Sequence, residues 1–146
     1  MNYRIRQYEE NDLHEVVSTW DKASEIGHPF FDKAFQAQER KNLAALYLPN
    51  ADTWVVEIDN HVVGFISLIG NEVGGLFLNP QYHRKKIGKL MMDKARAIHG
   101  DLEVEVFKKN QVGRRFYDKY GFSLLEKKIH EQTGEHVLRL KFTAGN

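Results

Sequence analysis

Apolar residues at strand and helix spacing divide the first third of the chain into three elements. Residues 3–8 alternate between polar and apolar side chains and predict a first strand. Apolar positions three and four residues apart then predict one face of a helix: Leu13, Val16, Val17, Trp20 and Ala23. Asp12 and Glu15 have the spacing of a reciprocal N-cap for this helix. A break at residues 27–31 follows, and Asp32 is expected to cap a second helix that runs to about Leu48.

The next apolar runs predict three consecutive antiparallel strands. Residues 54–58 and 62–69 flank the turn Asp59–His61 and have the pattern of a hairpin. Residues 70–71 turn the chain again into a third strand, which is expected to end at Leu78 because Asn79–Pro80 follows. The three strands form a meander, so the residues after Leu78 lie at its end.

A basic loop and a helix follow the third strand of the meander. The loop carries four basic or potentially basic residues, His83–Lys86, and the helix has apolar residues at helical spacing from Ile87 to Ile98. The start of a helix offers unpaired backbone N–H groups and partial positive charge, and Gly88 allows a ligand to approach the backbone closely. These features suit a phosphate or pyrophosphate. The residues alone leave an ordinary solvated loop open as the alternative.

The last third of the chain predicts a strand, a helix and a closing hairpin. Residues 102–106 alternate as a strand, which the strand–helix–strand order places parallel to the strand ending at Leu78 through a right-handed crossover. Residues 110–120 predict a helix with Phe116 facing inward and Gly121 at its C-cap. Residues 122–129 and 136–142 form the hairpin. We therefore expect one domain over residues 1–146 of mixed α/β (α+β) class, with six or seven mostly antiparallel strands and about four helices.

Composition narrows the classes of function. The chain has 146 residues, 42% hydrophobic and 28% charged, with a formal net charge of +1 and no Cys. These values are typical of a globular domain and argue against a polyelectrolyte binder. The lack of Cys excludes disulfides, thiolate metal sites and a cysteine nucleophile. No apolar signal region or membrane-length run is present and no His pair has metal-ligand spacing, so we expect a cytoplasmic protein without a metal.

Two segments resemble signatures of the GCN5-related N-acetyltransferases, the GNAT superfamily. Residues 110–122, Asn-Gln-Val-Gly-Arg-Arg-Phe-Tyr-Asp-Lys-Tyr-Gly-Phe, resemble its Asn-x-x-Ala-x-x-Phe-Tyr-x-x-x-Gly-Phe motif, with Gly113 in place of Ala. Residues 83–88 resemble its pyrophosphate loop, (Gln/Arg)-x-x-Gly-x-(Gly/Ala), but His83 and Lys86 replace the first two signature residues. The resemblance covers nearly the whole chain. More narrowly, residues 27–30, 54–55 and 105–111 are similar to small bacterial acetyltransferases, some of which acetylate protein lysines.

This resemblance implies an acetyl-CoA-dependent N-acetyltransferase acting on a primary amine, either a small molecule or a protein lysine or N-terminus. It implies a parallel pair of strands that splay apart at the cofactor, with a main-chain N–H near Leu78 as the oxyanion donor. The pyrophosphate would bind backbone N–H groups of residues 84–89. Lys86 is expected to be tolerated in place of glycine if its backbone stays right-handed helical. The cofactor-binding residues so implied are Leu76, Phe77, Leu78, His83, Arg84, Lys85, Lys86, Ile87, Gly88, Lys89, Asn110 and Phe116.

The resemblance also implies that Tyr117 is the general acid that protonates the departing thiolate. A reference pKa of about 10 keeps a tyrosine protonated at neutral pH, and packing against Phe116 is the alternative role for its ring. The general base stays open among five residues: His28, Glu57, Glu72, Glu103 and Glu105. Acceptor-binding residues are expected to include His28, Phe30 and Glu105. Because Cys is absent, direct attack of the amine in a ternary complex is the expected route.

Two other functions remain as alternatives. A non-catalytic acyl-CoA sensor would use the same loop, but it would have no need of the Tyr117 hydroxyl. A nucleic-acid-binding module would use residues 83–89 with Arg114 and Arg115, but the small net charge argues against it. The expected partners are therefore acetyl-CoA and an amine acceptor, without nucleic acid or membrane, for a monomer or homodimer.

Overall fold

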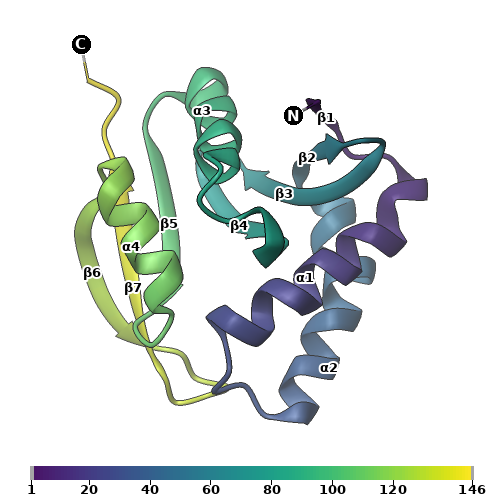
Figure 1. The fold of residues 1–146 in the computed structure, drawn as a ribbon. Helices are drawn as coiled ribbons and strands as arrows, with labels where there is room; N and C mark the ends of the chain where they lie inside the picture. Colours follow the sequence, from purple (N-terminus) through teal and green to yellow (C-terminus); the bar gives the residue numbers. More distant parts are fainter. Residues whose placement is uncertain (1, 146) are drawn as a thin grey trace.

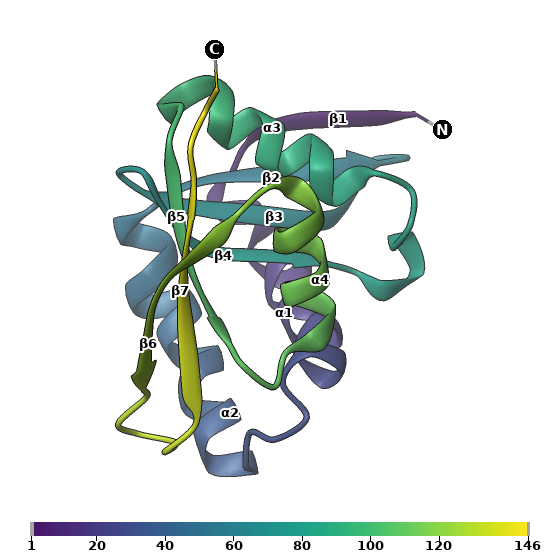
Figure 2. The same cartoon turned by 90° about the vertical axis from the view of Figure 1, so that its left-hand side faces the viewer.

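The computed structural model describes residues 2–145, which form one seven-stranded sheet with helices on both faces (Figures 1 and 2). The strand order across the sheet is β1-β2-β3-β4-β5-β7-β6, and every neighbouring pair is antiparallel except β4 and β5. The strands span Tyr3–Gln7 (β1), Asp52–Ile58 (β2), His61–Ile69 (β3), Glu72–Leu78 (β4), Leu102–Phe107 (β5), Ser123–Ile129 (β6) and His136–Phe142 (β7). The expected mixed, mostly antiparallel sheet is confirmed.

Four α-helices cover the sheet, and each face has its own hydrophobic core. The helices are α1 (Leu13–Gly27), α2 (Lys33–Asn42), α3 (Ile87–His99) and α4 (Gln111–Tyr120). Because side chains alternate along a strand, Val56 and Ile66 join the core under α3 and α4, whereas their neighbours Val55 and Phe65 join the core under α1. No helix within residues 2–145 has the length and apolar character needed to span a membrane.

The parallel strands β4 and β5 pair over only two positions. Glu72 is opposite Glu103 and Val73 is opposite Val104, and no register continues beyond them in the described chain. Gly74 is an extra residue in β4, because β3 pairs Leu68 with Val73 and Ser67 with Gly75. A bulge of this kind bends a strand and increases its twist, which fits the separation of β4 from β5 after Val73. The expected splayed parallel pair is therefore present.

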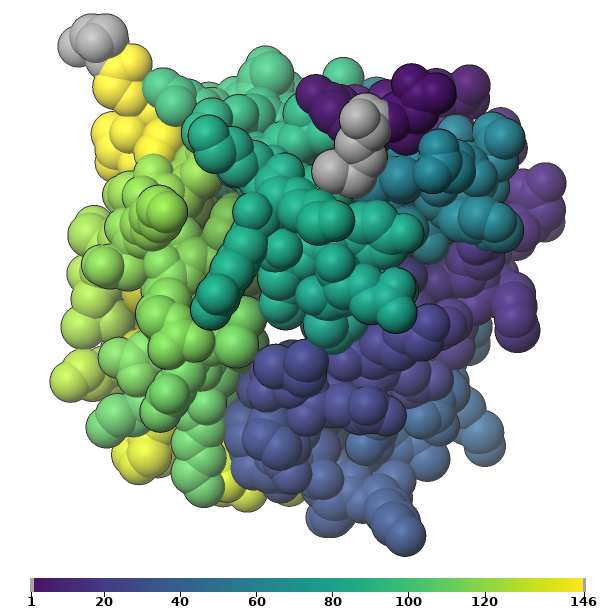
Figure 3. Space-filling view, viewed as in Figure 1, coloured from purple at the N-terminus to yellow at the C-terminus, as the bar shows by residue number. Residues whose placement is uncertain are grey.

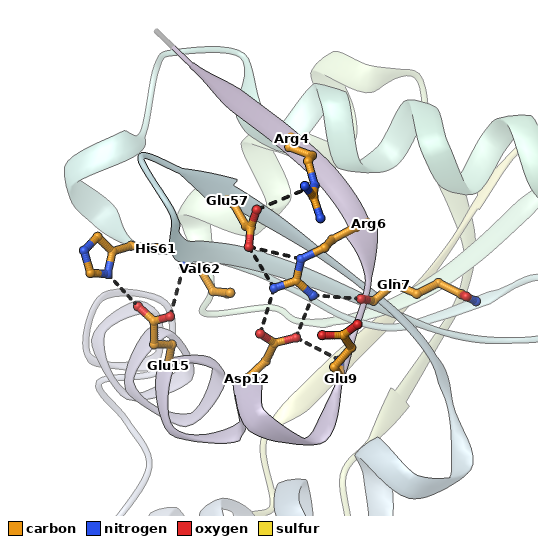
Figure 4. A network of polar contacts seen from close by, with 9 residues as sticks. All are labelled: Arg4, Arg6, Gln7, Glu9, Asp12, Glu15, Glu57, His61 and Val62. Carbon is orange, nitrogen blue, oxygen red and sulfur yellow. Dashed lines mark hydrogen bonds and ion pairs between the residues drawn. The ribbon is translucent and has the colours of Figure 1, made fainter.

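The start of α1 differs from the reciprocal cap expected of Asp12 and Glu15, and that prediction is wrong. Asp12 accepts a hydrogen bond from the Glu9 backbone N–H at 2.8 Å and a bidentate pair from Arg6 at 2.8 Å (Figure 4). Arg6 also donates to Glu57 of β2 at 2.9 Å. Glu15 instead accepts from the backbone N–H of Val62 at 3.3 Å. Tertiary partners thus take both carboxylates and fix α1 to the edge of the sheet.

The second helix begins as predicted and changes pitch before its end. Asp32 caps α2 by accepting from the Phe35 N–H at 2.7 Å. After α2, residues 43–47 form a wider π turn and residues 48–50 a 3₁₀ turn that contains Pro49. Leu43 and Leu48 are buried against the core under α1, so this irregular segment still reaches the sheet.

Candidate active site

The loop between β4 and α3 holds two non-glycine residues in the left-handed region. Arg84 has φ 65° and Lys86 has φ 64°. The condition under which Lys86 was expected to replace glycine without cost, a right-handed helical backbone, is therefore not met. Lys86 is the N-cap of α3 and has a left-handed backbone conformation. A side chain is strained in this conformation because its Cβ crowds the backbone, whereas glycine has no Cβ and adopts it freely.

The first turn of α3 lies open beside α4. The N–H groups of Ile87, Gly88 and Lys89 precede the first intrahelical hydrogen bond, from the Leu90 N–H to the Lys86 carbonyl at 3.1 Å. Gly88 lies directly against Phe116 of α4, because a Cβ added at Gly88 would be 3.0 Å from the Phe116 ring. The side chains of residues 84–86 are exposed, and Lys89 pairs with Asp93 at 2.7 Å. The predicted loop residues thus lie together at one helix N-terminus.

Phe116 and Tyr117 both pack against the core under α3 and α4. Tyr117 is 6% exposed and packs edge-on between Phe116, at 5.6 Å, and Phe122, at 5.4 Å. Phe116 is half-buried, and its ring lies against Gly88 at the junction of α3 and α4. Phe116 packs against the core under α3 and α4 as expected, but Tyr117 is the more deeply buried of the two rings. Burial raises the pKa of Tyr117, so the phenol keeps its proton at neutral pH.

Asn110 joins the start of α4 to the end of α1. Its Oδ1 accepts a hydrogen bond from the Gly113 N–H at 2.9 Å and caps α4. Its amide also lies against Gly27, where an added Cβ would be 3.2 Å from Oδ1. A Cβ at Gly113 would be only 2.7 Å from Nδ2, so the Ala of the family signature would displace this side chain. The observed orientation of the Asn110 side chain therefore requires glycine at position 113.

The separated ends of β4 and β5 lie between these elements. Figure 3 shows an opening in the molecular surface where the end of α1, the β4–α3 segment and α4 meet. Leu76 and Leu78 of β4 pack toward the core under α3 and α4, whereas Phe77 turns to the other face and stacks on Phe65 at 5.2 Å.

On the face of the sheet that α1 covers, His28 lies among aromatic rings at this gap. It stacks on Phe31 at 4.6 Å and meets Phe107, the last residue of β5, edge-on at 5.4 Å. Burial lowers the pKa of His28 to about 4, and its buried Nδ1 has no hydrogen-bond partner. The imidazole is therefore neutral at pH 7 and a weak base, which counts against the base role that was left open for it.

The candidate carboxylate bases are held in ion pairs. Arg139 of β7 contacts Glu103 at 2.7 Å, Glu105 at 2.9 Å and Glu72 at 3.4 Å. Burial raises the pKa of Glu105, but hydrogen bonds from Lys128 and Arg139 outweigh that effect and lower it. The remaining candidate base, Glu57 of β2, accepts hydrogen bonds from Arg6 (Figure 4). The sequence pattern identified these carboxylates but not Arg139. Arg139 lies far from them in the sequence, and only the pairing of β5 with β7 brings it beside them.

The chain is similar to a known protein family and to its members. Residues 49–124 match the profile of a family described as "Acetyltransferase (GNAT) domain". The chain is 30% identical over 130 residues to the peptidyl-lysine N-acetyltransferase YiaC of Escherichia coli (strain K12), covering 88% of this chain and 89% of that protein.

Two solved structures share the fold. The apo form of YjaB from Escherichia coli has a TM-score of 0.88 at 23% identity and covers 99% of this chain and 100% of that chain. The PaiA N-acetyltransferase of Thermoplasma acidophilum, solved in complex with coenzyme A, has a TM-score of 0.77 at 21% identity and covers 97% of this chain and 100% of that chain. The expected family, fold and acetyl-CoA-dependent N-acetyltransferase activity are confirmed.

Proposed function

Because this chain belongs to the GNAT family of N-acetyltransferases, we propose that it transfers the acetyl group of acetyl-CoA to a primary amine by direct attack in a ternary complex. The observation that carries this proposal is the short pairing of β4 with β5 beside the open N-terminus of α3. The gap leaves backbone groups of β4 free to meet an extended ligand, and the helix start supplies N–H groups for its phosphates.

The residues around this gap fit acetyl-CoA. Backbone N–H groups of residues 84–89 would bind the pyrophosphate, with His83 and the exposed basic side chains around it adding positive charge. Residues 76–78 would line the pantetheine arm from β4. Asn110 and Phe116 would line it from α4, where both lie half-buried at the junction with neighbouring helices. Gly88 fits this arrangement because its missing side chain leaves the backbone accessible beside the Phe116 ring.

The chemistry then needs two proton transfers and one oxyanion donor. The amine nitrogen attacks the thioester carbonyl, and a main-chain N–H near Leu78 stabilises the oxyanion, an interaction typically worth about 3 kcal/mol. Collapse breaks the carbon–sulfur bond, and Tyr117 gives its proton to the departing thiolate. The nitrogen loses one proton as it becomes an amide, and solvent returns a proton to the Tyr117 oxygen, so the phenol is restored. Burial raises the pKa of Tyr117, which keeps the phenol protonated at neutral pH and also makes it a weaker acid. The proton of the acceptor ammonium leaves to water, because each candidate carboxylate already has a cationic partner.

The acceptor we propose is a lysine side chain of a polypeptide, the substrate named for the YiaC relative. We further propose that residues 1–146 act as one domain, monomeric or homodimeric, in the cytoplasm and without nucleic acid or membrane as a partner. The absence of Cys and the small net charge support these proposals.

The test is an acceptor screen with the purified protein. Release of CoA thiol would be followed over lysine peptides, amino acids, polyamines and aminoglycosides at saturating acetyl-CoA. We expect turnover with at least one lysine peptide, and mass spectrometry should place 42 Da on its side chain amine, which is about the mass of one acetyl group. Calorimetric binding of acetyl-CoA without turnover on any amine would favour the sensor function instead.

A further inference from the structure

A groove lies between α4 and the last two strands of the chain, β6 and β7, on the side of α4 away from α3 (Figure 1). It opens to solvent with a volume of about 700 Å³, and in the described chain its lining holds four cationic side chains and one carboxylate. We call it the cationic groove, and its cations are Lys108, Arg114, Arg115 and Lys127. We propose that the cationic groove binds an extended, acidic segment of a partner protein along the edge of β6.

Within residues 2–145, the chain does not neutralise these cations itself, because none of the four forms an ion pair. All four side chains are exposed, and Arg114 is held beside Lys108 by a hydrogen bond that it donates to the Lys108 carbonyl at 3.0 Å. Asp118 is the carboxylate of the lining, so cations outnumber it four to one. Cations gathered around one groove reinforce each other's field, which attracts a segment that carries carboxylates.

The floor of the cationic groove is apolar. Leu138 and Leu140 of β7 form it together with Leu124 of β6, whose side chain is 54% exposed. Leu125 is an extra residue at a bulge in β6, where the pairing with β7 shifts. The bulge places Lys127 on the same face as Leu124, although the two are three residues apart, so apolar surface and positive charge meet in one groove.

The strand that borders the cationic groove has a free edge. β6 is the last strand in the order of the sheet, so one of its edges has no neighbouring strand in the described chain. All seven residues of β6 are exposed, and Leu125 and Ile129 are among them. Such an edge offers backbone N–H and C=O groups to an added strand, whose side chains then reach the groove beside it. An extended segment with both acidic and apolar residues therefore suits the edge, the floor and the cations together.

The lining argues against two other occupants. Phe122 is the one aromatic side chain that the described lining holds, and at 6% exposure it offers no ring surface on which nucleic acid bases could stack. A second copy of this chain that paired β6 with β6 would bring two sets of the same cations together, and their repulsion weakens such a contact. An acidic segment of another protein meets neither objection.

The cationic groove and the proposed cofactor site lie on different sides of α4. Arg114 and Asp118 line the groove, whereas Phe116 turns toward Gly88 of α3. At 100° per residue, Phe116 is about half a turn around the helix from the other two. A segment bound in the groove therefore leaves the acetyl-CoA site free, and the inference goes beyond acetyl transfer and does not depend on it.

The test measures the binding of fluorescein-labelled peptides by fluorescence anisotropy. The probe is a blocked peptide of seven residues, the length of β6, in which pairs of glutamates alternate with pairs of leucines. It contains no lysine, so it is not an acetyl acceptor. A matched peptide has glutamine in place of each glutamate, and a thymidine oligonucleotide represents nucleic acid. We expect the acidic peptide to bind about tenfold or more tighter than the glutamine peptide, and to bind more weakly as ionic strength rises from about 0.01 M to about 0.15 M. Equal affinity of the two peptides, or tighter binding of the oligonucleotide, would overturn the proposal.

Charge-reversal variants and hydrogen exchange locate the site. Arg114→Glu/Lys127→Glu should weaken binding of the acidic peptide by about tenfold or more, because attraction becomes repulsion. Lys33→Glu/Lys41→Glu makes the same change at two exposed lysines of α2 and should stay within about twofold of the wild type, since salt screens distant charges. Equal affinities in the two double variants would overturn the proposal. In the wild type, the bound peptide should slow hydrogen exchange at residues 123–129. Unchanged exchange would refute binding at this edge, and the same protection without peptide at high protein concentration would assign the edge to a second copy and overturn the proposal.

Discussion

Replacing Lys86 with glycine should stabilise the protein, although it removes a positive charge from the candidate phosphate site. Lys86 has φ 64° and ψ 18° at the N-cap of α3. A non-glycine residue in this region costs about 1–2 kcal/mol. Glycine avoids that cost but loses about 0.5–1 kcal/mol more conformational entropy on folding. The net expectation for Lys86→Gly is a gain of roughly 0.5–1 kcal/mol in unfolding free energy, from the difference of those two terms.

The neighbouring lysine provides a matched control. Lys85 is also an exposed lysine of this loop, but it is not among the residues with positive φ. Lys85→Gly removes the same charge and should lower the free energy of unfolding by about 0.5–1 kcal/mol, because only the entropy cost remains. Urea unfolding measures both values, and for Lys86→Gly we expect a melting temperature higher by about 2–4 °C. Equal destabilisation in the two variants would refute the assignment of backbone strain to Lys86.

Three further predictions concern the acid, the Arg6 network and the phosphate site. Tyr117→Phe should lower kcat by about 100-fold or more with little change in KM for acetyl-CoA, and near-normal kcat where chemistry limits the rate would contradict the acid role. Asp12→Asn should cost about 1–2 kcal/mol of unfolding free energy at pH 7, because it removes one of the two carboxylates that pair with the half-buried Arg6 and leaves Glu57 as the other. The Arg6 hydrogen bonds lower the pKa of Asp12, so this difference should be present above the unfolded pKa of about 3.9 and disappear as pH falls further in denaturation curves. Gly88→Ala should weaken acetyl-CoA binding in calorimetry, because the added Cβ would lie 3.0 Å from the Phe116 ring at the proposed phosphate site, and unchanged affinity would place that site elsewhere.

The order of elements was predictable because each has a local signal. The Asn79–Pro80 stop, the helical spacing after Ile87 and Gly121 at the end of α4 all mark boundaries that the structure keeps within a few residues. These signals depend on backbone hydrogen bonding and side-chain periodicity, which act over short stretches of chain. The sequence therefore indicated the meander, the crossover and the closing hairpin.

The details of the candidate site depend on contacts that no local signal reports. Tyr117 rather than Phe116 is buried because α4 is rotated so that the Phe116 ring covers Gly88 on another helix. Arg139 of β7 pairs with three carboxylates from β4 and β5, and only the register between these strands brings the four residues together. The left-handed conformation of Lys86 was also unpredictable from residue type, because lysine has no preference for it.

The division of the sheet into two faces explains how one gap can serve two ligands. β4 leaves β5 after two paired residues, next to the bulge at Gly74, so the gap lies between the two faces of the sheet. The face of α3 and α4 supplies helix N–H groups and basic side chains, which suit phosphates, whereas the face of α1 supplies uncharged rings, which suit an amine that must lose its proton. In the ternary complex proposed above, both ligands are bound at once. Approach from opposite faces satisfies this requirement, since neither ligand then blocks the entry of the other.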